Sequence, residues 1–177
     1  METMVHGGNW SSGRPYFLNI PRLLGQTLGL IAFGNVAQAV ARRAQAFNMQ
    51  VLAYDPYISE LEMTKIGVQP VSLNELLDRS DFVSMHTPLN DETRAMMSTQ
   101  QFARMKATAI YLNNGRGRTT DEAALTKALQ EGQIGGAGLD VLEQEPPDLE
   151  NALLHMDNVI VTPHIASASA RMMPETR

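Results

Sequence analysis

Residues 26–40, with the sequence QTLGLIAFGNVAQAV, constrain the fold more than any other stretch of the chain. A mostly apolar run leads to a tight turn that contains a glycine, and an alanine-rich segment follows, which is typical of a strand, a turn and a helix. Aligned on the pattern G-x-G-x-x-G, the turn has Ala32, Gly34 and Ala37, so only the middle glycine is retained. A glycine there lets the backbone approach a pyrophosphate at the N-terminus of the helix, which we expect to begin near Asn35. By itself this degenerate pattern fits a structural turn equally well.

A second apolar strand, residues 50–54, is followed directly by a carboxylate, Asp55. Asp55 lies 21 residues after Gly34, the spacing at which an acidic residue at the end of the second strand accepts hydrogen bonds from the adenosine ribose of a dinucleotide. The alternative is an Asp-Pro turn formed with Pro56. The two features together favour a dinucleotide site. Because a carboxylate at this point repels a 2′-phosphate, they favour NAD over NADP.

From residue 27 onward, segments typical of strands alternate with segments typical of helices, joined by short connections. The expected strands are 27–33, 50–54, 68–71, 82–85, 109–112, 136–141 and 159–161, and the expected helices are 36–47, 59–65, 72–79, 93–105 and 121–131. Ser72 and Glu75 form a capping-box signature at the start of the third helix. Such alternation predicts an α/β protein with a Rossmann-type, doubly wound parallel sheet.

The composition is that of an ordinary folded domain: 177 residues, 44% hydrophobic and 19% charged, enough to bury a core. A net charge of −5 with scattered basic residues argues against a nucleic-acid partner, and no apolar run approaches the roughly 18 residues of a membrane span. The chain has no cysteine, and no cluster of histidines and carboxylates indicates a metal site. Because no signal-peptide pattern is present either, a cytoplasmic location is expected by default.

Residues 1–26 differ from the rest, because they contain a stretch dense in Gly, Pro, Ser and Asn. They predict an N-terminal arm and linker before a domain that spans 27–164, with 165–177 as the start of a C-terminal segment. Trp10 and Phe17 are aromatic anchors in the arm. They either fold back on this domain or cover a second copy of it, and the sequence leaves both open.

The ends of the expected strands hold the candidate functional residues, because ligands bind an open parallel sheet outside the carboxyl ends of its strands. Four such ends should converge on one cleft beside the dinucleotide, and their residues are 85–88, 113–117, 140–146 and 162–164. They bring an arginine, a carboxylate and a histidine to this cleft, namely Arg116, Glu145 and His164.

Several stretches in this order resemble the D-isomer-specific 2-hydroxyacid dehydrogenases, a family that includes phosphoglycerate, glycerate and formate dehydrogenases and the related C-terminal-binding corepressors. The resemblance runs from about residue 21 to 166 and rests on LGLIAFGNVAQAVARRAQAF, VLAYDPY, DFVSMHTPLNDETR, YLNNGRGR, GAGLDVLEQEPP and NVIVTPHIA. It implies NAD as cofactor, a small 2-hydroxy or 2-oxo acid as substrate, and Arg116, Glu145 and His164 as catalytic residues. It also implies that Asp140 holds the nicotinamide carboxamide. The implied cofactor-binding residues are Phe33, Gly34, Asn35, Val36, Asp55, His86, Thr87, Pro88, Thr93, Asn114, Gly115, Asp140 and His164.

The chemistry of these residue types agrees with that assignment. Reduction of a 2-oxo acid needs a cation that grips the carboxylate, a proton donor and a hydride donor. Arg116 suits the first role because its planar fork binds a carboxylate bidentately. His164 suits the second, and a neighbouring Glu145 would favour its charged form and fix its orientation. The structural alternatives are a solvated turn arginine, a surface acid and a structural histidine, and for His86 a packing role is favoured.

The chain departs from the family pattern in three respects. Ala32 and Ala37 replace the outer glycines of the fingerprint. Asn114 and Arg118 flank the arginine with bulkier groups than the usual small residues, and most of the substrate-covering domain is absent from the chain. Two functions therefore compete: a dehydrogenase represented by its cofactor domain, and a non-catalytic NAD(H)-sensing protein of the corepressor type. Because family members pair through their nucleotide domains, the resemblance also implies a homodimer.

Overall fold

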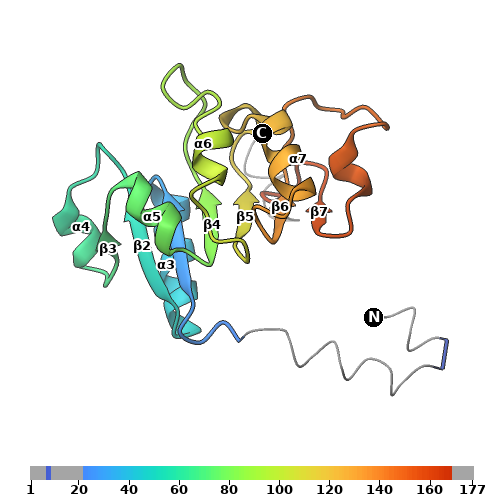
Figure 1. Cartoon of the computed structure of the whole chain (residues 1–177). Helices are drawn as coiled ribbons and strands as arrows, with labels where there is room; N and C mark the ends of the chain where they lie inside the picture. Colours follow the sequence, from blue (N-terminus) through green and yellow to red (C-terminus); the bar gives the residue numbers. More distant parts are fainter. Residues whose placement is uncertain (1–6, 9–21, 169–177) are drawn as a thin grey trace.

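The computed structural model describes residues 7–8 and 22–168 of the chain (Figure 1). The expected arm with Trp10 and Phe17 lies outside the described residues, and so does most of the expected C-terminal segment. The domain expected over residues 27–164 lies entirely within them.

Seven parallel strands form one sheet in the order β3-β2-β1-β4-β5-β6-β7. The strands are β1 (Thr27–Ile31), β2 (Gln50–Tyr54), β3 (Gln69–Pro70), β4 (Phe82–Met85), β5 (Ile110–Asn113), β6 (Gly136–Leu139) and β7 (Val159–Val161). The chain runs outward in one direction from β1 to β3 and in the other from β4 to β7. The predicted doubly wound parallel sheet is therefore confirmed, with its switch point between β1 and β4, where such sheets bind ligands.

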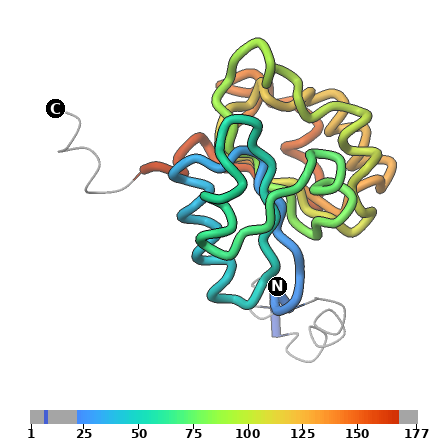
Figure 2. Tube along the Cα trace, turned by 90° about the vertical axis from the view of Figure 1, so that its left-hand side faces the viewer, coloured from blue at the N-terminus to red at the C-terminus, as the bar shows by residue number. Residues whose placement is uncertain are grey.

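Helices cover both faces of the sheet. They are α3 (Asn35–Ala46), α4 (Glu60–Thr64), α5 (Leu73–Arg79), α6 (Thr99–Phe102) and α7 (Glu122–Gln130), with two short 3-10 helices, η2 (Gly117–Thr119) and η3 (Ala152–His155). Residues of α3 and α4 share one hydrophobic core with β1 and β2, whereas α5, α6 and α7 share a second core on the opposite face. Figure 2 shows α3 and the green-to-orange helices on opposite sides of the strands.

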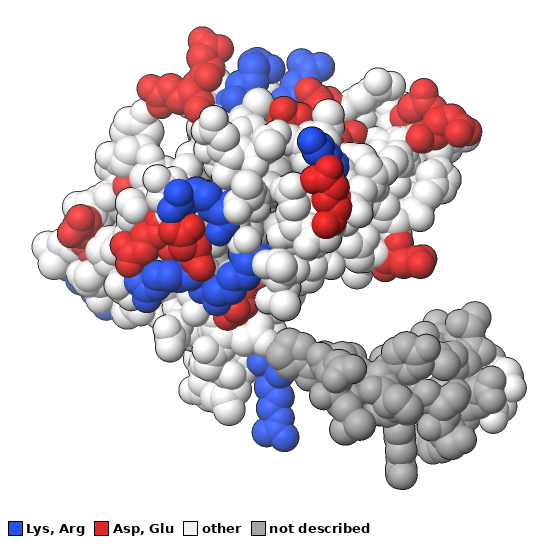
Figure 3. All heavy atoms as spheres, viewed as in Figure 1, with Lys and Arg blue, Asp and Glu red and all other residues white. Residues whose placement is uncertain are grey.

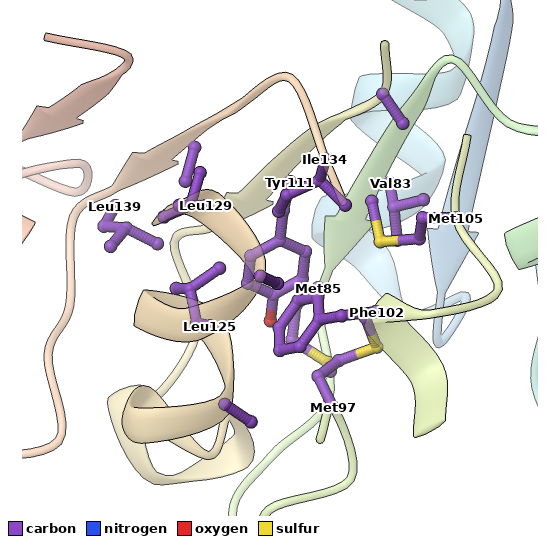
Figure 4. Close-up of a cluster of buried hydrophobic side chains, with 14 of the residues drawn as sticks. Val83, Met85, Met97, Phe102, Met105, Tyr111, Leu125, Leu129, Ile134 and Leu139 are labelled. Atoms are coloured by element: carbon purple, nitrogen blue, oxygen red, sulfur yellow. The ribbon is translucent and has the colours of Figure 1, made fainter. Parts of the chain in front are cut away.

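The two cores are built differently. Ala37 is fully buried at the start of α3, where its small side chain lets the helix lie close to the sheet. On the other face, the rings of Phe102 and Tyr111 meet edge to face, with centroids 5.4 Å apart and an interplanar angle of 85°. Met85 and Met97 are fully buried in the same core (Figure 4), where their flexible side chains fill the space around the rings.

Several predicted elements, including the strand 136–141 that ends with β6 at Leu139, are wrong in extent, and for two of them the physical reason is clear. The predicted helix 93–105 is present only as α6, and Met97 instead pairs with Thr120 in an isolated parallel bridge. The predicted strand 27–33 is shorter than expected and ends at Ile31. The next residue, Ala32, has a φ of 73° and cannot continue a strand. In both cases a contact or a backbone conformation outside the local pattern decided the outcome.

The predicted cap of α5 is half confirmed. The Ser72 hydroxyl accepts a hydrogen bond from the N–H of Glu75 at 3.2 Å. The Glu75 carboxylate does not return to the helix start, because it pairs with Arg79 one turn later at 2.5 Å. The short predicted strand 68–71 is reduced to β3.

Candidate active site

The turn between β1 and α3 keeps the shape of a glycine turn although its first position is Ala32. Ala32 adopts a left-handed conformation, with φ 73°, and its N–H donates to the Tyr54 carbonyl at 2.8 Å. At Gly34, just before α3, an added Cβ would meet nothing within 4 Å. No side chain caps this end of α3, and Asn35 and Val36 are exposed. The helix N-terminus therefore opens onto space in which its N–H groups and dipole can hold an anion such as a pyrophosphate.

Asp55 forms the Asp-Pro turn that the sequence offers as one alternative, and its second oxygen binds the fingerprint turn. Its Oδ1 accepts hydrogen bonds from the N–H groups of Tyr57 at 2.8 Å and Ile58 at 3.1 Å, which form the Asp-Pro turn. Its Oδ2 accepts from the N–H of Phe33 at 2.8 Å, which ties the end of β2 to the fingerprint turn. Phe33 is fully buried, and its carbonyl accepts from the Gln38 side chain at 3.2 Å. The structure therefore places Phe33 as a support of the turn and not at its open side.

A cavity of about 170 Å³ lies beside Asp55. It brings Asp55 together with Thr87, Pro88 and Thr93, three other residues that the resemblance assigns to the cofactor. The Thr93 hydroxyl donates to the Pro88 carbonyl at 2.6 Å and accepts from the N–H of Asn90 at 2.9 Å, which closes the loop after β4 into a fixed wall. A small cavity with apolar walls and a few fixed polar groups is typical of a ligand site.

The structure brings His164 and Glu145 into direct contact. His164 Nδ1 lies 2.7 Å from Glu145 Oε2, and Glu145 Oε1 accepts from the N–H of Leu142 at 3.0 Å. The hydrogen bond from His164 holds the pKa of Glu145 below its usual value, so the Glu145 carboxylate is ionised at neutral pH. Because Nδ1 is bound, Nε2 is the nitrogen of His164 that can exchange a proton with a ligand. The pair lines a cavity of about 440 Å³ together with Asp140 and Thr162.

Asp140 positions the turn that carries His164. Asp140 is only 4% exposed, and its carboxylate accepts hydrogen bonds from the Thr162 hydroxyl and from the N–H groups of Ile165 and Ala166. Its carbonyl accepts from the N–H of His164 at 2.9 Å. These bonds hold His164 at a φ of 53°, a conformation that a residue other than glycine rarely adopts.

The hydrogen bonds also fix the charge of Asp140. Burial by itself would raise the pKa of Asp140, but the hydroxyl and the two N–H donors outweigh burial and lower it. The family resemblance implies a nicotinamide contact for Asp140, but neither the resemblance nor the sequence pattern predicts this positioning role. The one available signal was an acidic residue near the end of the expected strand 136–141, ahead of the histidine loop.

Arg116 lies on the neighbouring loop, after β5, and is exposed. Its guanidinium donates to the Gly115 carbonyl at 2.7 Å. Asn113, which is buried, shapes the loop, because its amide nitrogen donates to the Arg116 carbonyl at 3.1 Å and its amide oxygen accepts from the N–H of Gly115 at 3.0 Å. The site residues predicted from the sequence include the exposed Asn114 but not Asn113.

The arginine loop packs tightly against the glutamate loop through Gly117. A Cβ on Gly117 would lie 1.8 Å from the carbonyl oxygen of Leu142, so only glycine fits there. The N–H of the same Leu142 binds Glu145. The close approach therefore fixes the spacing between the loop of Arg116 and the loop of Glu145.

His86 has the packing role that the sequence favours. Its Nε2 lies 2.9 Å from the Ser84 hydroxyl, and burial lowers the pKa of His86 to about 4, so the ring is neutral at pH 7. The Thr87 hydroxyl donates to the sulfur of Met85 at 3.0 Å. Because the His86 and Thr87 side chains bind groups of the protein itself, any contact of this strand end with a ligand would be made through the backbone.

Within residues 7–8 and 22–168, no group of three or more His, Cys, Asp or Glu side chains is arranged to hold a metal ion. No helix in these ranges has the length and apolar character that crossing a membrane requires. On the face shown in Figure 3, acidic and basic side chains are interspersed and do not form a basic stripe.

The family model described as "D-isomer specific 2-hydroxyacid dehydrogenase, NAD binding domain" matches residues 1–166. The chain belongs to this family. A glyoxylate reductase from Korarchaeum cryptofilum is 46% identical over 169 residues, which are 95% of this chain and 51% of that protein. A hydroxypyruvate reductase from Thermotoga maritima is 47% identical over 150 residues, which are 84% of this chain and 48% of that protein. The chain thus spans about half the length of these relatives.

A solved member of the 2-hydroxyacid dehydrogenases has the same fold. The crystal structure of a D-lactate dehydrogenase from Aquifex aeolicus, complexed with NAD and lactic acid, superposes with a TM-score of 0.87 at 33% identity. The match covers 98% of this chain and 56% of that chain. The residues present in this NAD-binding domain fit the cofactor, because the space before Gly34 is open and the Asp55 cavity lies at the same edge of the sheet.

Proposed function

We propose that the chain is the cofactor-binding part of an NAD-dependent oxidoreductase that acts on the CH–OH group of a 2-hydroxy acid and reversibly forms the 2-oxo acid. The observation that carries the proposal is the contact of 2.7 Å between His164 and Glu145 at the carboxyl edge of the sheet. In this proposal residues 27–164 form the cofactor-binding domain, and a substrate-covering domain completes the site.

Each catalytic residue has one task. Arg116 binds the substrate carboxylate bidentately, and its charge polarises the neighbouring carbonyl group. NADH, held at Gly34 and the start of α3, would supply the hydride that the carbonyl carbon accepts. His164 gives a proton from Nε2 to the carbonyl oxygen and takes it back in the oxidative direction. Glu145 holds His164 Nδ1 and stabilises the charged imidazole.

The cofactor contacts follow from the geometry of three elements. Gly34 and the start of α3 would hold the pyrophosphate, and the Asp55 carboxylate would accept from the adenosine ribose. A carboxylate offers about four acceptor positions, and three donors already use those of Asp140. One position of Asp140 remains for the nicotinamide carboxamide.

The enzyme is favoured over an NAD(H)-sensing corepressor, because the two relatives described above are reductases. Glyoxylate and hydroxypyruvate are therefore the first substrates to test.

A homodimer and a cytoplasmic location belong to the same proposal and rest on the sequence. Deletion of residues 1–20 should shift the dimer toward monomer in sedimentation, and a monomeric unmodified protein at high concentration would refute the assembly.

Binding is tested by titrating NADH and NADPH and following NADH or NADPH fluorescence. We expect the dissociation constant for NADH to be smaller than that for NADPH. Asp55→Ala should bring the two constants closer together, because it removes the carboxylate that favours the unphosphorylated ribose. Equal affinities of the unmodified protein for both cofactors would contradict the assignment of Asp55. Absence of any NADH binding would contradict the proposed function itself.

Turnover is tested with glyoxylate and hydroxypyruvate. Hydride transfer needs reacting atoms held in near-attack geometry in a site closed to water, and a shift of about 1 Å can cost on the order of a hundredfold in rate. This chain spans about half the length of its relatives, and in this proposal a further domain closes the site. We therefore expect its kcat to lie far below the ordinary enzyme value of roughly 10 per second. His164→Ala and Arg116→Ala should abolish the residual activity. His155→Ala is the matched control, because His155 does not line the cavity of His164 and Glu145 and its Nε2 binds the Leu149 carbonyl at 2.8 Å. Activity that survives His164→Ala would refute the catalytic assignment.

A further inference from the structure

The cavity beside Asp55 contains a second carboxylate that the proposed function does not use. Glu92, on the loop after β4, lines the same cavity of about 170 Å³. No lysine or arginine of the described residues lines it. Two acidic side chains without a basic partner make this cavity a region of negative potential.

Tyr57 connects the two carboxylates. Its backbone N–H donates to Asp55 Oδ1 at 2.8 Å, and its hydroxyl donates to Glu92 Oε2 at 2.5 Å. The hydrogen bond to Glu92 raises the pKa of Tyr57, so the hydroxyl remains a donor at neutral pH. The loop that carries Glu92 is itself closed by the hydrogen bonds of Thr93. The Glu92 carboxylate is thus held at the cavity from both sides.

We propose that Glu92 acts together with Asp55 to select NADH against NADPH, by repelling the 2′-phosphate that distinguishes the two cofactors. This inference rests on the proposed function, because it takes the Asp55 cavity as the adenosine site. Asp55 can both accept hydrogen bonds from ribose hydroxyls and repel a phosphate, whereas Glu92 contributes through its charge alone. Removing Glu92 should therefore change NADPH binding and leave NADH binding nearly unchanged.

The size of the effect follows from exposure. A phosphate monoester carries a charge of about −1.5 to −2 at pH 7, but solvent screens an exposed carboxylate such as Glu92. The repulsion should weaken NADPH binding on the order of fivefold, and it should decrease with added salt because screening shortens the range of the interaction.

The test is a fluorescence titration of the full chain with NADH and with NADPH, at low and at high salt. Glu92→Gln removes the charge and keeps an acceptor for Tyr57, so the ratio of the two dissociation constants should move toward unity by about fivefold at low salt. Glu92→Lys, which replaces the negative charge by a positive one, should lower the ratio of the NADPH to the NADH dissociation constant further. Asp91→Asn is the matched control, because Asp91 is an exposed neighbour that does not line the cavity.

Each outcome is decisive for one of the two proposals. The inference holds if Glu92→Gln lowers the preference for NADH at low salt and Asp91→Asn does not. It fails if both variants change the ratio equally, or if Glu92→Gln leaves the ratio unchanged while the unmodified protein binds NADH. If the unmodified protein binds neither cofactor, the proposed function fails instead.

Discussion

The substitution Ala32→Gly should stabilise the protein, although replacing alanine by glycine usually destabilises one. Ala32 is the first residue after β1 and has a φ of 73°. In this left-handed conformation the Cβ of an L-residue crowds the following carbonyl oxygen, which costs roughly 1–2 kcal/mol. The turn cannot relax, because the Ala32 N–H is bound to the Tyr54 carbonyl and the next N–H is bound to Asp55.

The expected gain is the strain that is removed less the entropy that glycine adds to the unfolded chain. Glycine lowers stability by roughly 0.5–1 kcal/mol relative to alanine through that entropy. The midpoints of the two ranges differ by about 0.75 kcal/mol, so we expect a net stabilisation of Ala32→Gly of about 0.5–1 kcal/mol. For a chain of 177 residues, 1 kcal/mol corresponds to a rise of about 2–4 °C in Tm, so we expect a rise of about 1–4 °C.

The assay is urea unfolding together with calorimetry of the two matched variants Ala32→Gly and Ala39→Gly. Ala39 lies inside α3, where the same chemical change should destabilise by about 0.5–1 kcal/mol because no strain is relieved. Opposite signs for the two variants would support the left-handed conformation of Ala32. A loss of stability in Ala32→Gly equal to that in Ala39→Gly would refute it.

Three further predictions concern the histidine and arginine loops. Asp140→Asn should lower the free energy of unfolding by about 2 kcal/mol, because an amide NH₂ replaces one acceptor oxygen facing N–H donors; hydrogen exchange should show faster opening of the turn that carries His164. Gly117→Ala should destabilise by about 1–3 kcal/mol, because its Cβ would collide with the Leu142 carbonyl, and urea unfolding measures the loss. The lowered pKa of Glu145 predicts stability that is complete above the unfolded value near 4.5 and is lost as the pH falls through the folded pKa. Urea midpoints at pH 7, 4 and 3 should therefore fall less in Glu145→Gln than in the unmodified protein, and equal declines would refute the linkage.

The sequence by itself determined the class of the fold and most of the candidate site. Periodic apolar runs separated by short polar connections specify strands and helices locally, and their alternation requires a parallel sheet. Because all strands of such a sheet end at one edge, the positions of Asp55, Glu145 and His164 in the sequence were enough to place them there. Gly34 marks a local turn, and its spacing to Asp55 is the length of one helix, a short connection and one strand.

Only the tertiary structure decided the features that depend on contacts between distant segments. Residues 93–98 have a helical pattern but lie along the arginine loop, because Met97 pairs with Thr120 and the N–H of Ala95 binds the Arg118 carbonyl. The left-handed Ala32, the fit of Gly117 against the glutamate loop and the bonds of Asp140 to the histidine turn have no local signature. The residues that contact Ala32, Gly117 and Asp140 lie far away in the sequence, and the order of strands in the sheet brings them together. Hydrogen bonds and steric fit between neighbouring loops then override the local conformational preference of these residues.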